Sequence, residues 1–450
     1  MATDLDELPL PGELPAIPDG WRYESLGDLV EERGVSYGIV QPGSEAPSGV
    51  PIVRVNNIRN GRIDTTDVLR VDADVEAKFL RSRLQGGEVL LTLVGTLGEV
   101  ARVPDDLRGW NVARAVGVIP VRQDPGSLWV SICLRSALIQ RYIRTWATTT
   151  VQATFNLRDL AKLPIPIPPT ATREAISGVL GALDDKIEVN RRMNATLEAM
   201  ARALFQSWFV DFDPVRAKVD GALPGGLDAA TASLFPDAFD GDVPRDWKRL
   251  ALRQVAEIHS GGTPNRGTAR FWTGDIPWVT PKGMQAVQVV DTDERVTAHA
   301  IGNGTRLAPK GAVLVMVRGM GLHQGVRVSQ LRVDAAFNQD VKAMVPTTID
   351  GTILLFALLD AAQSLHGKVH AAGHGTGVLA TDHLEQITVV VPPAHVVGTL
   401  ATKLTALNDR IASNNAENRT LAQLRDTLLP KLLNGELRLS EHEHEFSPTS

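Results

Sequence analysis

The stretches Leu183-Asp184-Asp185-Lys186-Ile187 and Leu407-Asn408-Asp409-Arg410-Ile411 decide the fold, because they lie 224 residues apart and match. The same offset pairs Asn190 with Asn414. Self-similarity at one fixed offset indicates an internal repeat, and here each repeat takes up about half of the chain. The sequence therefore predicts a duplicated protein with a pseudo-twofold relationship between its halves.

Around both stretches, apolar and asparagine residues recur in alternating steps of four and three. This spacing is that of a coiled-coil seam. Each predicted helix has about 35 residues and a length of roughly 50 Å. The simplest partner for each is the other helix of the same chain; the alternative is that both are core helices of two ordinary domains. The seam positions are Leu183, Ile187, Asn190, Leu197, Leu407, Ile411, Asn414 and Leu421.

The end of the second helix carries two further signals. Pro430 falls inside the seam pattern, so we expect the last turn to kink or restart there. Asn434-Gly435 is a good C-terminal stop.

The segment before each helix reads as mixed α/β. Each opens on Pro-x-x-Trp, at Pro18 and at Pro244, and closes on a proline-rich exit. We predict strands over 50–55, 88–94, 115–121, 276–280, 312–317 and 341–346, and helices over 128–145 and 349–363. The predicted fold class is α+β, with two globular α/β domains and two long antiparallel coiled-coil helices.

Composition limits the class of protein. At about 150 residues a domain, 450 residues suggest two to three domains. The single cysteine, Cys133, rules out a disulfide framework and a cysteine-based zinc site, and it fits a reducing cytosol. We find no signal peptide and no apolar run long enough for a membrane span, so we expect a cytoplasmic protein of a bacterium or archaeon.

Charge is distributed unevenly along the chain. The net charge is −6, yet five acidic residues lie in the first 21 positions and eight aspartates in residues 211–246. Residues 22–168 hold 18 basic against 16 acidic side chains, and residues 247–393 hold 14 against 11. Both large segments are thus mildly basic, which permits nucleic-acid binding on one face.

Motifs for catalysis are missing from the sequence. Gly95-Thr96-Leu97-Gly98 lacks the lysine and hydroxyl of a phosphate-binding loop. Pro168-Pro169-Thr170 and Pro392-Pro393-Ala394 lack the acid and the aromatic residue of an amino-methyltransferase box, and no dinucleotide-binding glycine motif follows a strand. We therefore predict a protein without catalytic residues; the competing hypothesis is a nuclease or methyltransferase acting alone.

Three histidines could suggest a metal site. His366, His370 and His374 have helical i, i+4 spacing, which can bind a metal. Neighbouring glycines interrupt such a helix and no cysteine or acid completes a set, so we predict no metal. The favoured interpretation is a polar, glycine-rich loop, which in a DNA-binding protein could contact the DNA backbone.

Several motifs together resemble the specificity subunits of type I restriction-modification systems. The resemblance covers residues 18 to 438. It is carried by Trp21-x-x-x-x-Leu26-Gly27-Asp28, Trp247-x-x-x-x-Leu252, Gly86-Gly87-Glu88-Val89-Leu90, Lys310-Gly311-Ala312-Val313-Leu314, Ile165-Pro166-Ile167-Pro168-Pro169, Gln206-Ser207-Trp208-Phe209-Val210-Asp211-Phe212-Asp213-Pro214-Val215 and Leu428-Leu429-Pro430-Lys431-Leu432-Leu433-Asn434-Gly435-Glu436-Leu437.

The resemblance implies a function and partners. Two target-recognition domains at opposite ends of the helix pair would each read one half of a bipartite site in double-stranded DNA. The helices would set the unread spacer. Two methyltransferase subunits would bring S-adenosylmethionine and methylate adenine, and two nuclease-translocase subunits would use ATP and magnesium, while this chain binds no cofactor. The alternative is a DNA-targeting subunit of a methylation-only or other phage-defence system.

The resemblance and the repeat together define expected domain boundaries. They are an acidic extension over 1–17, recognition domain 1 over 18–169, helical spacer 1 over 170–210, a linker over 211–243, recognition domain 2 over 244–393, helical spacer 2 over 394–438 and an acidic tail over 439–450.

Candidate DNA contacts are polar residues on loops after strands, because base edges and phosphates are read by Arg, Lys, Asn, Gln and small polar groups. For each of them the competing interpretation is a solvated or turn-capping side chain. In the first domain they are Arg54, Asn56, Asn57, Arg59, Thr96, Asn111 and Arg114. In the second they are Thr280, Lys282, Arg318, His323, Asn338, Gln339, Lys368, His370 and His374.

Overall fold

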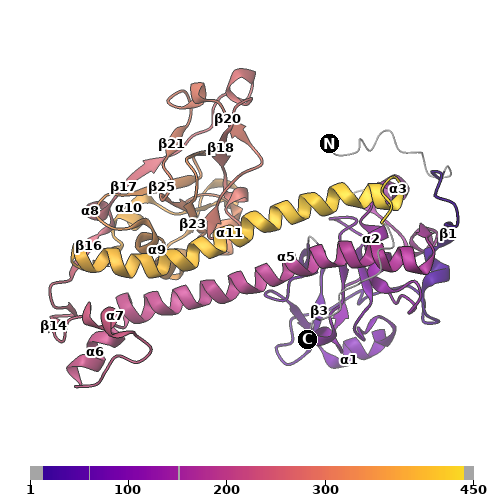
Figure 1. The fold of residues 1–450 in the computed structure, drawn as a ribbon, viewed down its shortest axis with the longest axis horizontal. Coiled ribbons are helices and arrows are strands. Elements are labelled where there is room, and N and C mark those ends of the chain that lie inside the picture. The colour runs from indigo at the N-terminus through magenta and orange to yellow at the C-terminus, as the bar shows by residue number, and fades with distance from the viewer. Residues whose placement is uncertain (1–13, 60, 150–152, 440–450) are drawn as a thin grey trace, which may run out of the picture. The chain divides into compact units, whose positions relative to one another are not determined.

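A computed structural model describes residues 14–59, 61–149 and 153–439 of the chain. It divides into two compact units, unit 1 with residues 1–187 and 420–450, and unit 2 with residues 188–419. The division crosses both long helices, so each unit holds one globular α/β part and a length of each helix (Figure 1). No helix in the described ranges combines the length and apolarity that a membrane crossing needs.

The two long helices form as the seam pattern predicts. Helix α5 spans Thr170–Phe205 with 36 residues, and α11 spans Ala394–Leu433 with 40. Gly435, with φ of 73°, follows the end of α11, as expected for a C-terminal stop. The expected restart at Pro430 is wrong, because α11 continues through it to Leu433. Pro430 lies in the last turn, where its missing N–H costs only one hydrogen bond.

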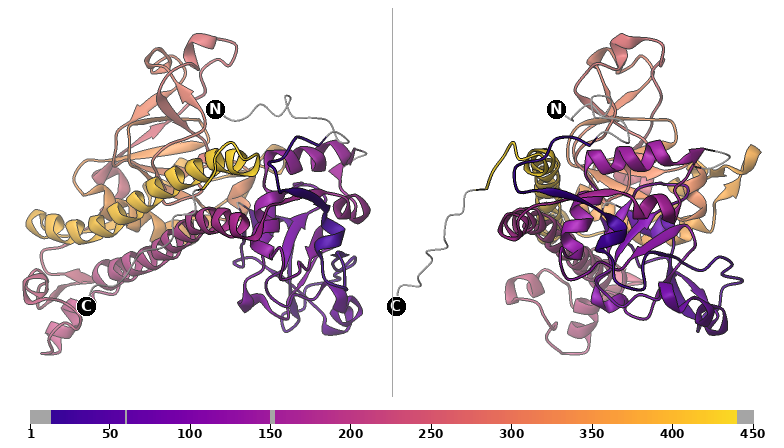
Figure 2. Two further views of the ribbon diagram at one scale, coloured as in Figure 1. Left: turned by 45° about the vertical axis from the view of Figure 1, so that its right-hand side comes forward. Right: turned by 90° about the vertical axis from the view of Figure 1, so that its right-hand side faces the viewer.

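Polar pairs in the seam show that the helices run antiparallel. In unit 2, Asn190 Nδ2 donates to Asn418 Oδ1 at 3.0 Å, while Asn414 Nδ2 donates to Asn194 Oδ1 at 2.8 Å. Residue numbers thus rise along α5 as they fall along α11, and the two helices lie side by side in every view (Figure 2). The alternative of two separate core helices is wrong.

The remaining seam positions follow the heptad pattern. Ile187, Asn190, Ile411 and Asn414 are buried. Half-buried positions are Leu183, Leu197, Leu407 and Leu421. Asparagines at the buried positions favour one register at a cost in stability.

Unit 1 has two main sheets and four short helices. One sheet has the order β2-β10-β7-β8 and the other β6-β3-β9, in which β3 and β9 are parallel. The strands are β1 (Arg22–Ser25), β2 (Ser36–Tyr37), β3 (Val50–Val53), β4 (Ile58–Arg59), β5 (Arg62–Ile63), β6 (Leu69–Val71), β7 (Val89–Thr92), β8 (Val100–Arg102), β9 (Asn111–Val112), β10 (Val116–Ile119), β11 (Thr148–Thr149), β12 (Ala153–Thr154) and β13 (Pro164–Ile167). The short helices are α1 (Ala73–Glu76), α2 (Ser127–Leu134), α3 (Ala137–Trp146) and α4 (Leu157–Ala161), of which α2 to α4 cover the larger core.

Unit 2 repeats this plan. Its larger sheet has the order β17-β25-β22-β23-β19 and its smaller sheet β20-β18-β24-β21, in which β18 and β24 are parallel. The strands are β14 (Phe239–Asp240), β15 (Val243–Pro244), β16 (Lys248–Ala251), β17 (Ala256–Ser260), β18 (Ile276–Val279), β19 (Gln288–Val289), β20 (Arg295–Val296), β21 (Arg306–Ala308), β22 (Val313–Met316), β23 (Val328–Leu331), β24 (Ala335–Phe337), β25 (Val341–Pro346), β26 (His370–Ala371), β27 (Gly377–Val378) and β28 (Thr388–Val391). The helices are α6 (Asp213–Val219), α7 (Ala229–Ser233), α8 (Leu252–Val255), α9 (Gly351–His366) and α10 (Thr381–Glu385).

The repeat is visible in matching local structures. Trp21 N donates to Pro18 O at 3.1 Å, and Trp247 N donates to Pro244 O at 2.9 Å, so both Pro-x-x-Trp signals are turns. Each of the six predicted strands contains an observed strand. The expected single helix over 128–145 is wrong, because α2 ends at Leu134 and Ser136 caps the start of α3.

Candidate nucleic-acid interface

In unit 2, the loops after two parallel strands lie next to each other. Val279, the last residue of β18, is opposite Phe337, the last residue of β24, and Asn338 N donates to Val279 O at 2.9 Å. Thr280 and Asn338 therefore meet at one edge of the sheet. The carboxyl ends of parallel strands are a frequent place for ligand binding in α/β proteins.

Further backbone bonds join this edge to two glycine-rich loops. The amides of Val317 and Arg318 both donate to Asp340 O, at 2.8 and 3.2 Å. Gly319 N donates to Gly377 O at 3.0 Å, and His323 Nε2 lies 2.8 Å from Gly375 O. Four predicted segments thus form one surface. We call it the unit 2 edge, and it comprises residues 280–283, 318–325, 338–340 and 367–378.

Most predicted side chains of the unit 2 edge point to solvent. Those of Lys282, Arg318, His323, Gln339, Lys368 and His370 are exposed, and Thr280 is half-buried. Asn338 is buried, and its Nδ2 donates to Asp340 Oδ2 at 3.0 Å, so it holds the loop in shape. The side chain of His374 lies outside the described part of the structure.

Unit 1 has the same arrangement. Ala113 N donates to Val53 O at 2.9 Å, which joins the ends of the parallel strands β3 and β9. Leu93 N donates to Ala115 O at 2.8 Å and Phe155 N to Leu93 O at 2.9 Å, which adds the glycine turn and the segment after β12. We call residues 54–57, 94–98 and 113–115 the unit 1 edge.

The unit 1 edge carries fewer available side chains. Asn56, Thr96 and Arg114 are exposed. Arg54 is half-buried and its Nη2 donates to Asp67 Oδ2 at 3.1 Å, which partly neutralises it. Arg59 is exposed on β4, in a hairpin that packs beside β8, and it is not among the residues that define the unit 1 edge.

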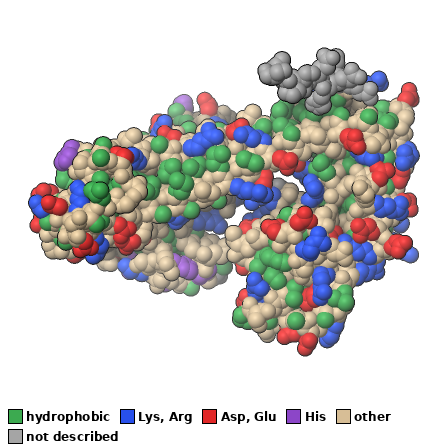
Figure 3. Space-filling view, turned by 60° about the horizontal axis from the view of Figure 1, so that its bottom comes forward, with side chains coloured by type: hydrophobic (Ala, Val, Ile, Leu, Met, Phe, Trp, Pro, Cys, Tyr) green, Lys and Arg blue, Asp and Glu red, His purple; other side chains and the backbone are tan. Residues whose placement is uncertain are grey.

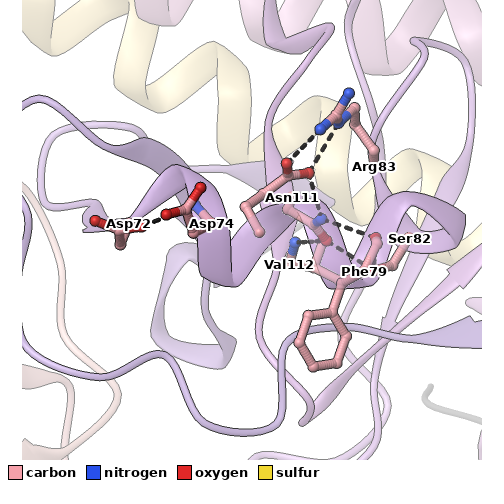
Figure 4. A network of polar contacts seen from close by, with 8 residues as sticks. Asp72, Asp74, Phe79, Ser82, Arg83, Asn111 and Val112 are labelled. Atoms are coloured by element: carbon pink, nitrogen blue, oxygen red, sulfur yellow. Dashed lines mark hydrogen bonds and ion pairs between the residues drawn. The ribbon is translucent and has the colours of Figure 1, made fainter.

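Two of the predicted DNA-contact residues in unit 1 have side chains that hydrogen-bond within the fold. Asn57 is buried, and its Nδ2 donates to the backbone oxygens of Asp64 and Asp67 at 3.0 and 2.7 Å. Asn111 is fully buried, and its Nδ2 donates to Glu76 Oε1 at 2.9 Å (Figure 4). Both amides hold loops in place, so we leave them out of the proposed DNA-facing set.

The carboxylate that holds Asn111 is itself paired. Arg83 Nε donates to Glu76 Oε1 at 2.8 Å. This hydrogen bond is the main reason that the pKa of Glu76 lies below its ordinary value, against the opposing effect of burial. The network fixes β9 against α1, and Arg114 lies three residues beyond Asn111.

The strand ends define one further correspondence between the halves. The bond from Ala113 to Val53 matches that from Asn338 to Val279. The counterpart of Asn338 is therefore Ala113 and not Asn111. Arg114 and Gln339, one residue later, occupy equivalent positions.

Sequence reasoning also missed an arm over residues 263–270 of unit 2. Thr263 Oγ1 donates to Gln339 Oε1 at 2.7 Å, which joins the arm to the unit 2 edge. Arg266 makes two bonds to Glu294, at 2.6 and 3.1 Å, and its guanidinium lies 3.9 Å from the ring centre of Trp272. The Gly261-Gly262 pair before the arm was the available signal, because such pairs mark turns.

Charge on these surfaces is local. Among the described residues, no hydrogen bond or ion pair engages the side-chain cations of Arg114, Arg318 or Lys368. Acidic and basic groups otherwise alternate over the face seen in Figure 3, without one broad field of either sign. Such a surface suits local phosphate contacts at the loops, since phosphate binding depends on nearby Lys and Arg side chains.

The histidines do not share a helix. His366 ends α9, and His370 lies in β26, so the i, i+4 geometry of a helical metal site is not formed. Across the described ranges, no group of three His, Cys, Asp or Glu side chains could hold a metal ion.

Comparison with known proteins adds a family and relatives. The family model for the type I restriction modification DNA specificity domain matches residues 18–199 and again residues 244–423. The type I restriction enzyme HindI specificity subunit of Haemophilus influenzae is 29% identical, over 93% of this chain and 99% of that protein. The MjaIX specificity subunit of Methanocaldococcus jannaschii is 21% identical, over 95% of this chain and 96% of that protein.

Solved structures are similar at lower identity. The crystal structure of a type I restriction-modification system S subunit from M. genitalium has a TM-score of 0.49 and 16% identity. The match covers 95% of this chain and 98% of that one.

Proposed function

Because this chain belongs to the family of type I restriction modification DNA specificity domains, which matches it once in each half, we propose that it reads a bipartite DNA site. The observation that carries the proposal is the double match to a DNA specificity domain, with an equivalent loop edge in each unit. Recognition domain 1 (18–169) reads one half-site and recognition domain 2 (244–393) reads the other.

The proposed DNA-facing residues are the exposed members of the two edges. In unit 1 they are Asn56, Thr96 and Arg114, with Arg54 partly available, and Arg59 is a peripheral candidate. In unit 2 they are Lys282, Arg318, His323, Gln339, Lys368 and His370, with Thr280 half-buried and partly available, and His374 belongs to the same loop. Unpaired cations on loops suit phosphate contacts, and amides and guanidinium groups suit base edges.

The helical segments 170–210 and 394–438 set the distance between the half-sites. With 36 residues, α5 is about 54 Å long at 1.5 Å per residue. A rigid helix pair with a fixed register gives a fixed spacer, in the way that dimer geometry sets half-site spacing in other DNA-binding proteins. The seam asparagines supply that register.

Catalysis belongs to partner subunits in this proposal. Two methyltransferase subunits bring S-adenosylmethionine and methylate adenine, and two nuclease-translocase subunits use ATP and magnesium. This chain contributes only the recognition of the DNA sequence, and it acts in the cytoplasm, where the cell's DNA is found.

The test is to map every methylated adenine in a host genome. The chain is co-expressed with its methyltransferase in a methylation-free host, and N6-methyladenine is mapped by long-read sequencing. We expect one bipartite motif, methylated on both strands and absent when this chain is omitted. No motif from a folded, assembled complex would overturn the proposal, and methylation by the chain alone would show an enzyme instead. Restriction activity with the nuclease subunit separates a full system from a methylation-only one.

A further inference from the structure

Arg114 and Gln339 occupy one position of the duplicated fold with two different side chains. Each lies one residue after the amide that closes the ends of the parallel strands, at Ala113 and at Asn338. A second bond confirms the register, because Ile39 N donates to Val112 O at 2.8 Å and Gly262 N to Phe337 O at 2.9 Å.

The neighbourhood of the two positions is also shared. Arg114 N donates to Ile39 O at 2.9 Å, and Gln339 Oε1 accepts from Thr263 Oγ1 at 2.7 Å. Ile39 and Gly262 are equivalent, so both positions lie against the same neighbouring segment. The backbone is fixed in each unit while the side chain is exposed.

The two side chains differ in the base they match. A guanidinium donates two parallel hydrogen bonds, which suit O6 and N7 of guanine. A carboxamide accepts from N6 and donates to N7 of adenine. In Gln339, Thr263 takes one lone pair of the carbonyl oxygen and so fixes the orientation of the amide. The second lone pair and the Nε2 donors remain for a base.

We propose that Arg114 and Gln339 are equivalent base-reading residues, Arg114 for a guanine in one half-site and Gln339 for an adenine in the other. The inference rests on the proposed function and adds to it a chemical code at one position of each half. It explains how one duplicated fold reads two different half-sites, since the scaffold stays the same and the side chain changes.

The alternative for Arg114 is a phosphate contact. Phosphate contacts weaken binding to all sequences alike and leave the motif unchanged. Base readout instead changes the preference at one position and spares the rest. A methylome and a binding selection distinguish these outcomes.

The experiment exchanges the two side chains in the full chain, assembled with its methyltransferase. The variants are Arg114→Gln and Gln339→Arg. The control is Arg102→Gln, an exposed arginine at the opposite end of the sheet on β8. Each complex is mapped by methylome, and its binding is selected from duplexes that carry every single-base change of the wild-type site.

We expect Arg114→Gln to replace a guanine by an adenine at one position of one half-site, with a preference change of roughly 5- to 150-fold. Gln339→Arg makes the reverse change in the other half-site, and Arg102→Gln keeps the wild-type motif. A uniform loss of binding with an unchanged preference overturns the inference, as do two variants that alter the same half-site. A wild-type complex without any motif instead overturns the proposed function.

Discussion

Asp184 of α5 accepts a hydrogen bond from Arg425 of α11 at 2.8 Å, and its second carboxylate oxygen accepts one from Arg135 at 2.8 Å. One side chain thus ties both helices of unit 1 to the globular part. The repeat places Asn408, Ala201 and Leu359 at the equivalent positions of unit 2. The two units therefore attach their helices by different chemistry.

The surroundings of Asp184 in unit 1 and of Asn408 in unit 2 differ as well. In unit 1, a pocket of about 210 Å³ is lined by Ile132, Leu180 and Leu429 beside the two arginines. In unit 2, the counterparts of Ile132 and Leu429 are Phe356 and Phe205, whose rings stack at 5.9 Å. Where unit 1 has an ionic network beside a pocket, unit 2 thus has an aromatic core at the equivalent place.

The first prediction concerns the ionic network. Arg425→Ala leaves Asp184 with one partner in a half-buried site, so we expect a loss of about 1–2 kcal/mol from the stability of unit 1. Hydrogen exchange of α5 residues 170–187 in urea measures it. Arg410→Ala, exposed on the same helix, is the control and changes nothing. Equal protection in both variants contradicts the assignment.

The second prediction concerns pH. Burial alone would raise the pKa of Asp184, but the charges and hydrogen bonds of Arg135 and Arg425 outweigh burial and lower it. A depressed carboxyl pKa gives stability that is complete above the unfolded value of about 4 and is lost as pH falls through the folded value. We expect unit 1 of the wild type to lose stability below about pH 4 more steeply than Asp184→Asn. Parallel pH profiles would refute this.

The third prediction concerns Asn408. It is buried, and both polar atoms of its side chain lack a partner among the described residues. Replacing an unsatisfied buried amide by an apolar group of similar shape is stabilising, so Asn408→Leu raises stability by about 1–2 kcal/mol. Asn194→Leu is the matched contrast and lowers stability, because Asn194 bonds Asn414 and Asn415 at 2.8 Å each. Calorimetric melting compares the two, and a lower melting temperature for Asn408→Leu argues for an ordered water at that site.

The fourth prediction concerns the phosphate contacts. Lys368→Ala and Arg318→Ala each remove one unpaired cation from the unit 2 edge. Each reduces the slope of log affinity against log salt by about 1. Lys310→Ala, exposed at the other end of β22, leaves the slope unchanged. Titrations of the assembled complex with its duplex site at several salt concentrations decide between these outcomes.

The fifth prediction concerns the spacer. One heptad inserted between Leu183 and Asn190, with another between Asn418 and Arg425, lengthens the helix pair by about 10 Å. We expect a spacer longer by about three base pairs, or loss of methylation if the partners no longer fit. Full activity with the wild-type spacer would disprove the role of the helices.

Sequence periodicity carried much of the fold. The heptads around Leu183 and Leu407 predicted both long helices and their antiparallel pairing, because a seam of this length needs a partner. Alternation and turn signals located six strands. The break between α2 and α3 was missed, because Ser136 reads as an ordinary helical residue until its hydroxyl caps the next helix.

The candidate site was predicted only in part. The loops carrying Arg318, Gln339 and Lys368 meet in unit 2, as expected for segments that follow neighbouring strands. Asn57 and Asn111 have the same sequence signature, yet their amides bond to the interior. The arm at Thr263 lies 76 residues from Gln339, and no local pattern relates the two.

The sequence by itself determined the duplication, the long helices, the family and the lack of catalytic motifs, because periodicity and motifs are local properties of the chain. Tertiary structure alone decided which side chains face solvent, that Arg114 and Gln339 share a position, and that Asp184 joins two helices while Asn408 joins none. These features depend on contacts between distant residues, and such contacts exist only once the sheets and helices have packed.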